Sequence, residues 1–160
     1  MTTYAPSSRF PQDQDAGETA KILGGQKPAV GDELPELVIE ASVRSIVSTA
    51  IATRDYQDVH HDIEAAQMRG SKTIFTNILT SNGYCIRFVT DWTGPEAVVK
   101  RAKIRLGVPN YAGDTMTMTG SVSEVEQVDD GTRVTVAVQG ANSLGNHVTG
   151  TVTVLLPKDA

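Results

Sequence analysis

The segment TIFTNILTSNGYCI, residues 73–86, carries no formally charged side chain. If this segment is a helix, its apolar side chains gather on one face and also spread around the cylinder, at Ile74, Phe75, Ile78, Leu79, Cys85, Ile86 and Val89. Such a helix is buried on most sides. It is too short and too rich in Thr, Ser and Asn to cross a bilayer, so we expect other parts of the protein to enclose it.

Four runs in which apolar and polar residues alternate follow this segment, and a period near two predicts strands. The runs cover residues 102–108, 116–122, 134–138 and 148–156, with the turns VPNYAGD, VDDGTR and NSLGNH between them. The order predicts an α+β fold, in which an antiparallel sheet wraps around a buried central helix. Because such a sheet has an open edge and covers its helix incompletely, we expect a dimer that continues the sheet.

The first third of the chain divides into a tail and the start of the domain. Residues 1–32 contain prolines, a glycine pair and few large apolar residues, so we predict a flexible N-terminal tail followed by one domain, residues 33–160. Residues 34–38 predict an edge strand, where Pro35 is tolerated. Residues 45–54 suit a helix or a strand, with the helix favoured, and residues 62–70 predict a short helix ended by a glycine.

Composition limits the class of protein. The chain has 160 residues, of which 39% are hydrophobic, and a net charge of −5, which gives no general attraction to nucleic acid or to an anionic membrane. The single Cys85 excludes an internal disulfide framework and a cysteine-based zinc finger. The N-terminus lacks the order of a signal peptide, and no run of about 20 apolar residues occurs. These features predict a cytoplasmic protein.

The loop ATRDYQDVHHD, residues 52–62, gathers carboxylates and two adjacent histidines. It could be a solvated loop, a metal site or an acid–base pair. A metal site at His60, His61 and Asp62 would need further ligands, and only the distant His147 is left among the histidines, so we expect none. Asp55 and His60 would lie about 16 Å apart on a strand at roughly 3.3 Å per residue, and about 140° apart on a helix. Only a turning loop would bring them together.

These motifs together resemble the MaoC-like enoyl-CoA hydratases and dehydratases, which have the hot-dog fold. The family's loop usually reads Gly-Asp-x-Asn-Pro-x-His, and here Asp55 and His60 match it while the family's Gly, Asn and Pro are replaced by Arg54, Gln57 and Asp58. The stretch RLGVPNYAGDTMTMTGSVSEV, residues 105–125, is similar to the family's strand, turn and strand, with the matching residues Pro109, Gly113 and Asp114. The resemblance covers about residues 32–157.

A narrower resemblance, on VSTAIATRDYQDVHHD, FTNILTSNGY, VTDWTGP and RLGVPNYAGDT, is to the small MaoC-like subunits of steroid enoyl-CoA hydratases in bacteria that shorten the cholesterol side chain. It implies an α2β2 heterotetramer with a second MaoC-like subunit, and an unsaturated steroid-side-chain thioester of coenzyme A as substrate. No separate cofactor is implied, because coenzyme A is part of the substrate. Two alternatives stay open: a non-catalytic partner subunit of such a hydratase, and an acyl-CoA thioesterase.

The resemblance also implies roles for three residues. Hydration of an enoyl thioester needs a base for the attacking water, a proton donor for Cα and a donor to the enolate oxygen. We expect Asp55 to be the principal base, with His60 orienting the water and helping to return its proton. The family commonly has His-Gly where this chain has Thr76-Asn77, so the backbone N–H of Asn77 is the expected oxyanion donor.

Overall fold

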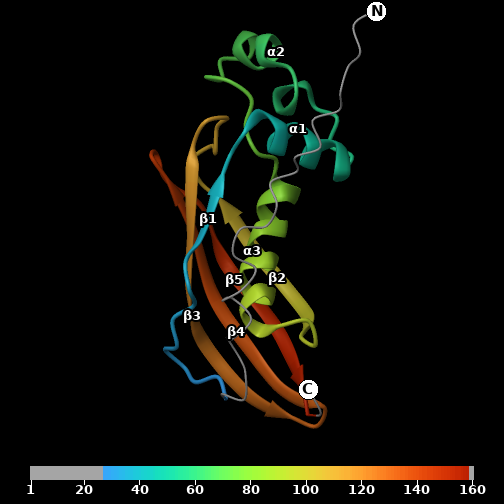
Figure 1. The fold of residues 1–160 in the computed structure, drawn as a ribbon, viewed down its shortest axis with the longest axis vertical. Helices are drawn as coiled ribbons and strands as arrows, with labels where there is room; N and C mark the ends of the chain where they lie inside the picture. Colours follow the sequence, from blue (N-terminus) through green and yellow to red (C-terminus); the bar gives the residue numbers. More distant parts are fainter. Residues whose placement is uncertain (1–26, 159–160) are drawn as a thin grey trace, which may run out of the picture.

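A computed structural model describes residues 27–158 as one five-stranded antiparallel sheet with a long helix packed along one face (Figure 1). The strand order is β1-β3-β4-β5-β2. The strands are β1 (Leu37–Glu40), β2 (Val98–Leu106), β3 (Thr115–Val128), β4 (Gly131–Asn142) and β5 (Gly145–Pro157). The helices are α1 (Val43–Ala52), the 3-10 turn η2 (Asp58–His60), α2 (Ile63–Met68) and α3 (Ile78–Thr93).

The predicted fold, an antiparallel sheet wrapped around a central helix, is confirmed. Three of the four alternating runs lie within a strand, and the first, 102–108, extends two residues past the end of β2. The runs of β3, β4 and β5 are joined by two tight hairpins, where Val128 pairs with Gly131 and Asn142 pairs with Gly145. Each glycine directly follows the two loop residues and has a positive φ angle, 156° for Gly131 and 123° for Gly145, which a residue without a Cβ adopts at little cost. In Figure 1, α1 and α2 lie together beyond one end of α3.

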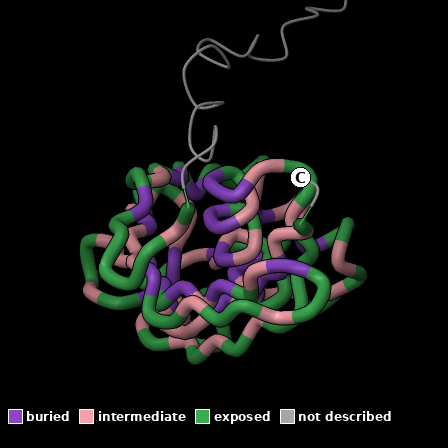
Figure 2. The backbone as a smooth tube through the Cα atoms, turned by 90° about the horizontal axis from the view of Figure 1, so that it is seen from below, coloured by how far each residue is buried: buried purple, intermediate pink, exposed green. Residues whose placement is uncertain are grey.

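The main core lies between α3 and the inner face of the sheet, where buried positions gather in Figure 2. The helix contributes Cys85, Phe88, Val89 and Trp92, and the facing strands contribute Met116, Met118, Val122, Val134, Val136, Val138, Val148, Val152 and Val154. Burial raises the pKa of the Cys85 thiol to about 11. This cysteine is therefore a neutral, unreactive core residue.

The predicted helix at residues 73–86 starts too early. The helix α3 begins at Ile78, and residues 74–76 run extended beside residues 110–112, with hydrogen bonds from Thr76 N to Asn110 O and from Ala112 N to Ile74 O, both 3.0 Å. The β-branched side chains of this stretch favour an extended backbone. Asn77, a residue type that favours helix N-caps, then starts the helix.

The expected burial of α3 on most sides fails at its start. Ile78 and Leu79 are 53% and 50% exposed, so one face at the start of the helix is uncovered in the single chain. Ile74 is fully buried, but it belongs to a second, smaller core with Ala41, Ile46 and Ala66. The apolar residues of the segment therefore divide between two cores and one open surface.

The other predicted elements are close to those observed. Most of residues 45–54 lie in α1, which starts two residues earlier and ends at Ala52. Residues 62–70 contain α2, which Asp62 caps and Gly70 follows with a φ of 83°. The edge strand lies at 37–40 rather than 34–38, because Leu34 packs into the core instead.

The predicted tail lies mostly outside the described residues, since residues 1–26 are not described. Within the described part, the backbone of Gly31 donates to Val122 O and Val122 N donates to Asp32 O, so these residues already pair with β3. The boundary at Glu33 stays a prediction. Among residues 27–158, no helix has the length and apolar character needed to cross a membrane.

Two glycine-to-alanine substitutions should have opposite effects on stability, because Gly150 lies at the close contact of β2 and β5 and Gly83 lies in an open part of α3. A Cβ on Gly150 would lie 2.1 Å from the backbone oxygen of Lys103, so Gly150→Ala should force the strands apart and destabilise the fold by about 1–3 kcal/mol. At Gly83, inside α3, a Cβ meets nothing within 4 Å, and Gly83→Ala should stabilise by about 0.5–1 kcal/mol. Urea unfolding measures both; equal midpoints for Gly150→Ala and the wild type would contradict the predicted clash.

Candidate active site

The chain turns sharply after α1, and this turn presents Asp55. Thr53 N and Asp55 N donate to Thr49 O and Ala50 O, at 3.0 Å each, which closes the C-terminus of α1. Between them, Arg54 has a φ of 57°, in the left-handed region that costs an L-residue roughly 1–2 kcal/mol. The MaoC-like loop usually has glycine at this position. Arg54 thus adopts the backbone that a glycine would take without cost.

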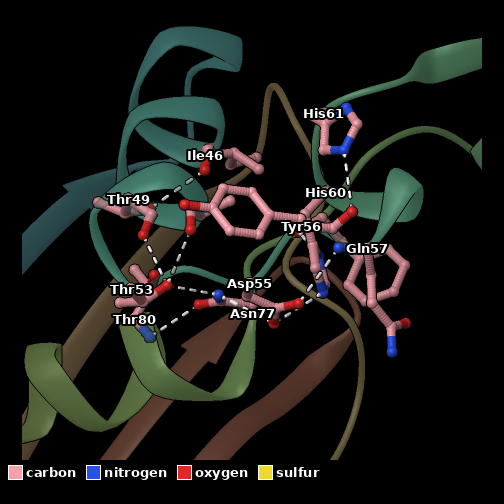
Figure 3. Close-up of polar contacts among 12 residues, drawn as sticks. Ile46, Thr49, Thr53, Asp55, Tyr56, Gln57, His60, His61, Asn77 and Thr80 are labelled. Carbon is pink, nitrogen blue, oxygen red and sulfur yellow. Dashed lines mark hydrogen bonds and ion pairs between the residues drawn. The ribbon is translucent and has the colours of Figure 1, made fainter.

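The loop brings Asp55 and His60 together. The Asp55 Oδ2 atom lies 3.5 Å from His60 Nε2, and the two side chains are 21% and 8% exposed. The turn η2 produces this approach, with His60 N donating to Gln57 O at 3.0 Å and Gln57 N donating to Asp55 Oδ1 at 3.4 Å. In Figure 3, Asp55 and Asn77 lie side by side, with Thr53 and Thr80 to one side and His60 to the other.

The backbone of Phe75 fixes the proton on His60. His60 Nδ1 lies 2.8 Å from Phe75 O, and a carbonyl oxygen only accepts, so Nδ1 carries the hydrogen. The Phe75 ring also packs edge-on against the imidazole, with the ring centroids 5.0 Å apart. The Nε2 atom then faces the Asp55 carboxylate, and in this tautomer of the ring it is the atom that carries the lone pair.

In this tautomer, His60 Nε2 and Asp55 Oδ2 are both hydrogen-bond acceptors, 3.5 Å apart. A donor that serves both atoms would remove the repulsion between their lone pairs. A water molecule can donate one hydrogen to Asp55 Oδ2 and the other to His60 Nε2, at about 2.8 Å from each. Its oxygen lone pairs then point away from both bases. This arrangement suits a water that attacks an electrophile.

The start of α3 lies beside this pair. Asn77 is the N-cap, with its Oδ1 accepting from Thr80 N at 2.8 Å, and it is 3% exposed. Its backbone N–H has no hydrogen-bond partner among residues 27–158, and no acidic side chain occupies the first turn of α3. A helix N-terminus with a free N–H group attracts a developing negative charge.

The remaining ionisable residues of the loop make other contacts. Asp58 pairs with Arg69 at 2.6 Å, and His61 is exposed, with Nε2 3.3 Å from Tyr56 O. Within the described part of the chain, no three or more His, Cys, Asp or Glu side chains gather as they would around a metal ion.

Sequence reasoning did not anticipate a second buried histidine at the other side of the helix start. His147 is 2% exposed, and its Nδ1 donates to Val108 O at 2.7 Å, so its Nε2 accepts from the Ser81 hydroxyl at 2.8 Å. Burial lowers the pKa of His147, and the hydrogen bond to Val108 opposes this in part. In its neutral form, His147 thus links Val108 to Ser81 of α3. No short motif marks this contact, because 66 positions separate the two side chains.

An antiparallel sheet wrapped around one helix defines the hot-dog fold, and the Asp55–His60 loop lies at the start of that helix. No protein-family model matches the chain. The chain is 56% identical over 123 residues to the 3-oxo-4,17-pregnadiene-20-carboxyl-CoA hydratase beta subunit of Mycobacterium tuberculosis, which covers 77% of this chain and 92% of that protein.

Solved structures agree with this match. A chain of the ChsH1–ChsH2 complex from Mycobacterium tuberculosis superposes with a TM-score of 0.75 and 52% identity, over 81% of this chain and 99% of that chain. The (R)-hydratase from A. caviae that is involved in PHA biosynthesis has a TM-score of 0.72 at 19% identity, over 82% of this chain and 99% of that one, and so shares the fold. The chain belongs to the MaoC-like hot-dog hydratase family.

The buried His147 predicts a loss of stability in acid. Because burial lowers its pKa in the folded state, the unfolded chain binds the proton more readily. The stabilisation is complete above about pH 6.5, the ordinary histidine value, and is lost progressively as the pH falls below it. Urea unfolding at pH 7.5 and pH 5.5 should therefore show a smaller loss for His147→Gln than for the wild type. Equal losses in the two proteins would contradict this role of His147.

Proposed function

We propose that this chain is the subunit of an enoyl-CoA hydratase that carries the acid–base pair. The observation that supports this function best is the 3.5 Å approach of Asp55 Oδ2 to His60 Nε2, with the imidazole lone pair turned toward the carboxylate. A partner subunit that does no chemistry would have no need of that arrangement.

The proposed reaction adds water across the α,β double bond of an unsaturated acyl-CoA. The water oxygen bonds to Cβ while Asp55 takes one of its protons, and the electron pair of the double bond moves toward the thioester oxygen. A proton then returns to Cα, with His60 helping to deliver it, and the thioester carbonyl re-forms. Atoms and charges balance without a separate cofactor, since coenzyme A is part of the substrate.

The Asn77 N–H is the proposed donor to the enolate oxygen. It lies at the start of α3, where it has no partner among the described residues and where the helix N-terminus adds partial positive charge. The loss of one such donor typically costs about 2.7–4 kcal/mol of transition-state stabilisation. The backbone at this position therefore has to keep its geometry in any functional variant.

We further propose a steroid-side-chain enoyl-CoA as substrate. This assignment is supported by the named activity of the relative that is 56% identical. Large apolar residues are exposed around the proposed site, at Ile51, Tyr56, Ile78 and Leu79, with exposed fractions of 50% to 69%. An apolar ring system can pack on such side chains. We also propose a cytoplasmic location, which rests on the sequence features alone.

A second MaoC-like subunit is the proposed partner, in an α2β2 assembly. The relative is a beta subunit, and the similar solved structure is a complex of two different proteins. In this chain β2 lies at one edge of the sheet and exposes Val98 and Val99, which are 46% and 37% accessible. A partner strand on β2 would continue the sheet and cover these residues.

Substitution of the pair tests the catalytic proposal. In the assembled complex, Asp55→Asn and His60→Ala should each lower the rate at which the enoyl-thioester absorbance disappears by about 10²–10⁴-fold, the usual contribution of general acid–base catalysis. His61→Ala is the matched control, because His61 is exposed and its Nε2 lies 3.3 Å from Tyr56 O rather than at Asp55. It should keep the wild-type rate.

Unchanged rates for Asp55→Asn and His60→Ala in assembled complexes would show that this chain is a non-catalytic partner. Release of free thiol in the same assay would instead identify a thioesterase, the other alternative that the hot-dog fold allows.

Assembly and substrate size are tested together. The purified chain, alone and mixed with its partner, is separated by size-exclusion chromatography and each fraction is assayed. Full activity should occur only in the mixed complex. That complex should hydrate a steroid-side-chain enoyl-CoA faster than a short linear one, because the exposed apolar side chains favour a large apolar acyl group. A fully active homodimer would refute the need for a partner, and equal kcat/KM values for both substrates would refute the steroid preference.

A further inference from the structure

The side chain of Asn77 contacts the proposed base directly. Asn77 Nδ2 lies 3.1 Å from Asp55 Oδ2 and 2.9 Å from Thr53 Oγ1, and all three residues are drawn in Figure 3. We propose that the Asn77 carboxamide is a positioning residue for the hydration reaction, which holds the Asp55 carboxylate toward His60. This inference rests on the proposed function of Asp55.

The orientation of the amide follows from its partners. The Thr80 N–H, 2.8 Å away, can only donate, so the atom that faces it must be the Asn77 oxygen. The nitrogen then has to face Thr53 and Asp55. The opposite orientation would place an amide N–H against a backbone N–H and would leave the carboxylate facing an oxygen.

Thr53 accounts for the second N–H of the amide. The Thr53 hydroxyl donates within α1, to Thr49 O at 2.7 Å, so its oxygen is free to accept from Asn77. The two N–H groups of Asn77 therefore have two acceptors, one on the last turn of α1 and one on the carboxylate. The side chain links three parts of the site: the end of α1, the turn that carries Asp55 and the start of α3.

The common form of the MaoC-like motif lacks this link, because it has glycine at the position of Asn77. A glycine supplies a backbone N–H but no side chain. Asn77 is 3% exposed, so its hydrogen bond to a charged group is shielded from water. The Oδ2 atom that it binds is the one that faces His60 Nε2. Asn77 thus fixes the carboxylate oxygen that shares a water with the histidine.

A capping role alone would also explain a buried asparagine at a helix start, and two substitutions separate the roles. Asn77→Ser keeps an N-cap oxygen for Thr80 N but is too short to reach Asp55. Asn77→Asp keeps the cap and the shape but turns a carboxylate oxygen toward Asp55. Both variants retain the backbone N–H that is proposed for the enolate oxygen.

Few titratable groups surround Asp55, so the pH–rate profile reports mainly on the protonation of this carboxylate. His60 is the titratable side chain in contact with Asp55, the last turn of α1 has no basic residue, and the first turn of α3 has no acidic one. Asp58, also in the loop, is paired with Arg69. A second carboxylate at position 77 would therefore favour the protonated, inactive form of the base. The acid limb of the rate profile should move to higher pH.

The experiment measures kcat, KM and the pH–rate profile of the assembled complex with an enoyl-CoA substrate, beside thermal unfolding. We expect Asn77→Ser to lower kcat about tenfold or more, the effect of losing one hydrogen bond to a charged group. KM and the unfolding temperature should stay near the wild-type values. Asn77→Asp should lower kcat as well and should shift the acid limb upward.

Wild-type kcat and an unshifted acid limb in both variants would overturn the inference and leave Asn77 as a helix cap. That failure is distinguishable from failure of the proposed function: a wild-type rate for Asp55→Asn refutes the role of Asp55 itself. An inactive Asp55→Asn with fully active position-77 variants refutes only the positioning role. If Asn77→Ser does not fold, the isosteric Asn77→Asp decides the matter through its pH profile.

Discussion

The short pairing of residues 74–76 with residues 110–112 determines where α3 starts, and the candidate site depends on that start. Hydrogen bonds between these segments hold Phe75 extended, so that its carbonyl oxygen accepts from His60 Nδ1 and selects the tautomer of the imidazole. The next residues then bring the Asn77 side chain and its free N–H to Asp55. A shift of the helix start by one residue would break the contacts of Phe75 with His60 and of Asn77 with Asp55.

The site contains few charges, and this follows from the uncharged segment that forms its wall. Asp55 faces an imidazole and an amide rather than a lysine or an arginine, in a setting that is mostly closed to water. The helix N-terminus supplies positive potential where an enolate would form. The base and the anion site therefore act on different atoms of one substrate.

The sequence predicts the sheet well and the start of the central helix poorly. Alternation at 102–108 or 148–156 is a local signal, and residues 102–106 and 148–156 lie within observed strands. Residues 73–77 look helical by apolar content alone, but their extended form depends on a loop more than 30 positions away. For the same reason the Asp55–His60 spacing suggested a turn, whereas the partners of each side chain, such as Phe75 O, could not be predicted from local patterns.

The central claim is that Asp55 and His60 act on one water molecule. A double-mutant cycle on the assembled hydratase tests it most directly, with the rate of enoyl-thioester hydration measured for Asp55→Asn, His60→Ala and the double variant. If the two side chains act as one unit, the double variant should be about as slow as the slower single variant. A loss in the double variant equal to the product of the two single losses would show that the residues act independently, and would contradict the shared water.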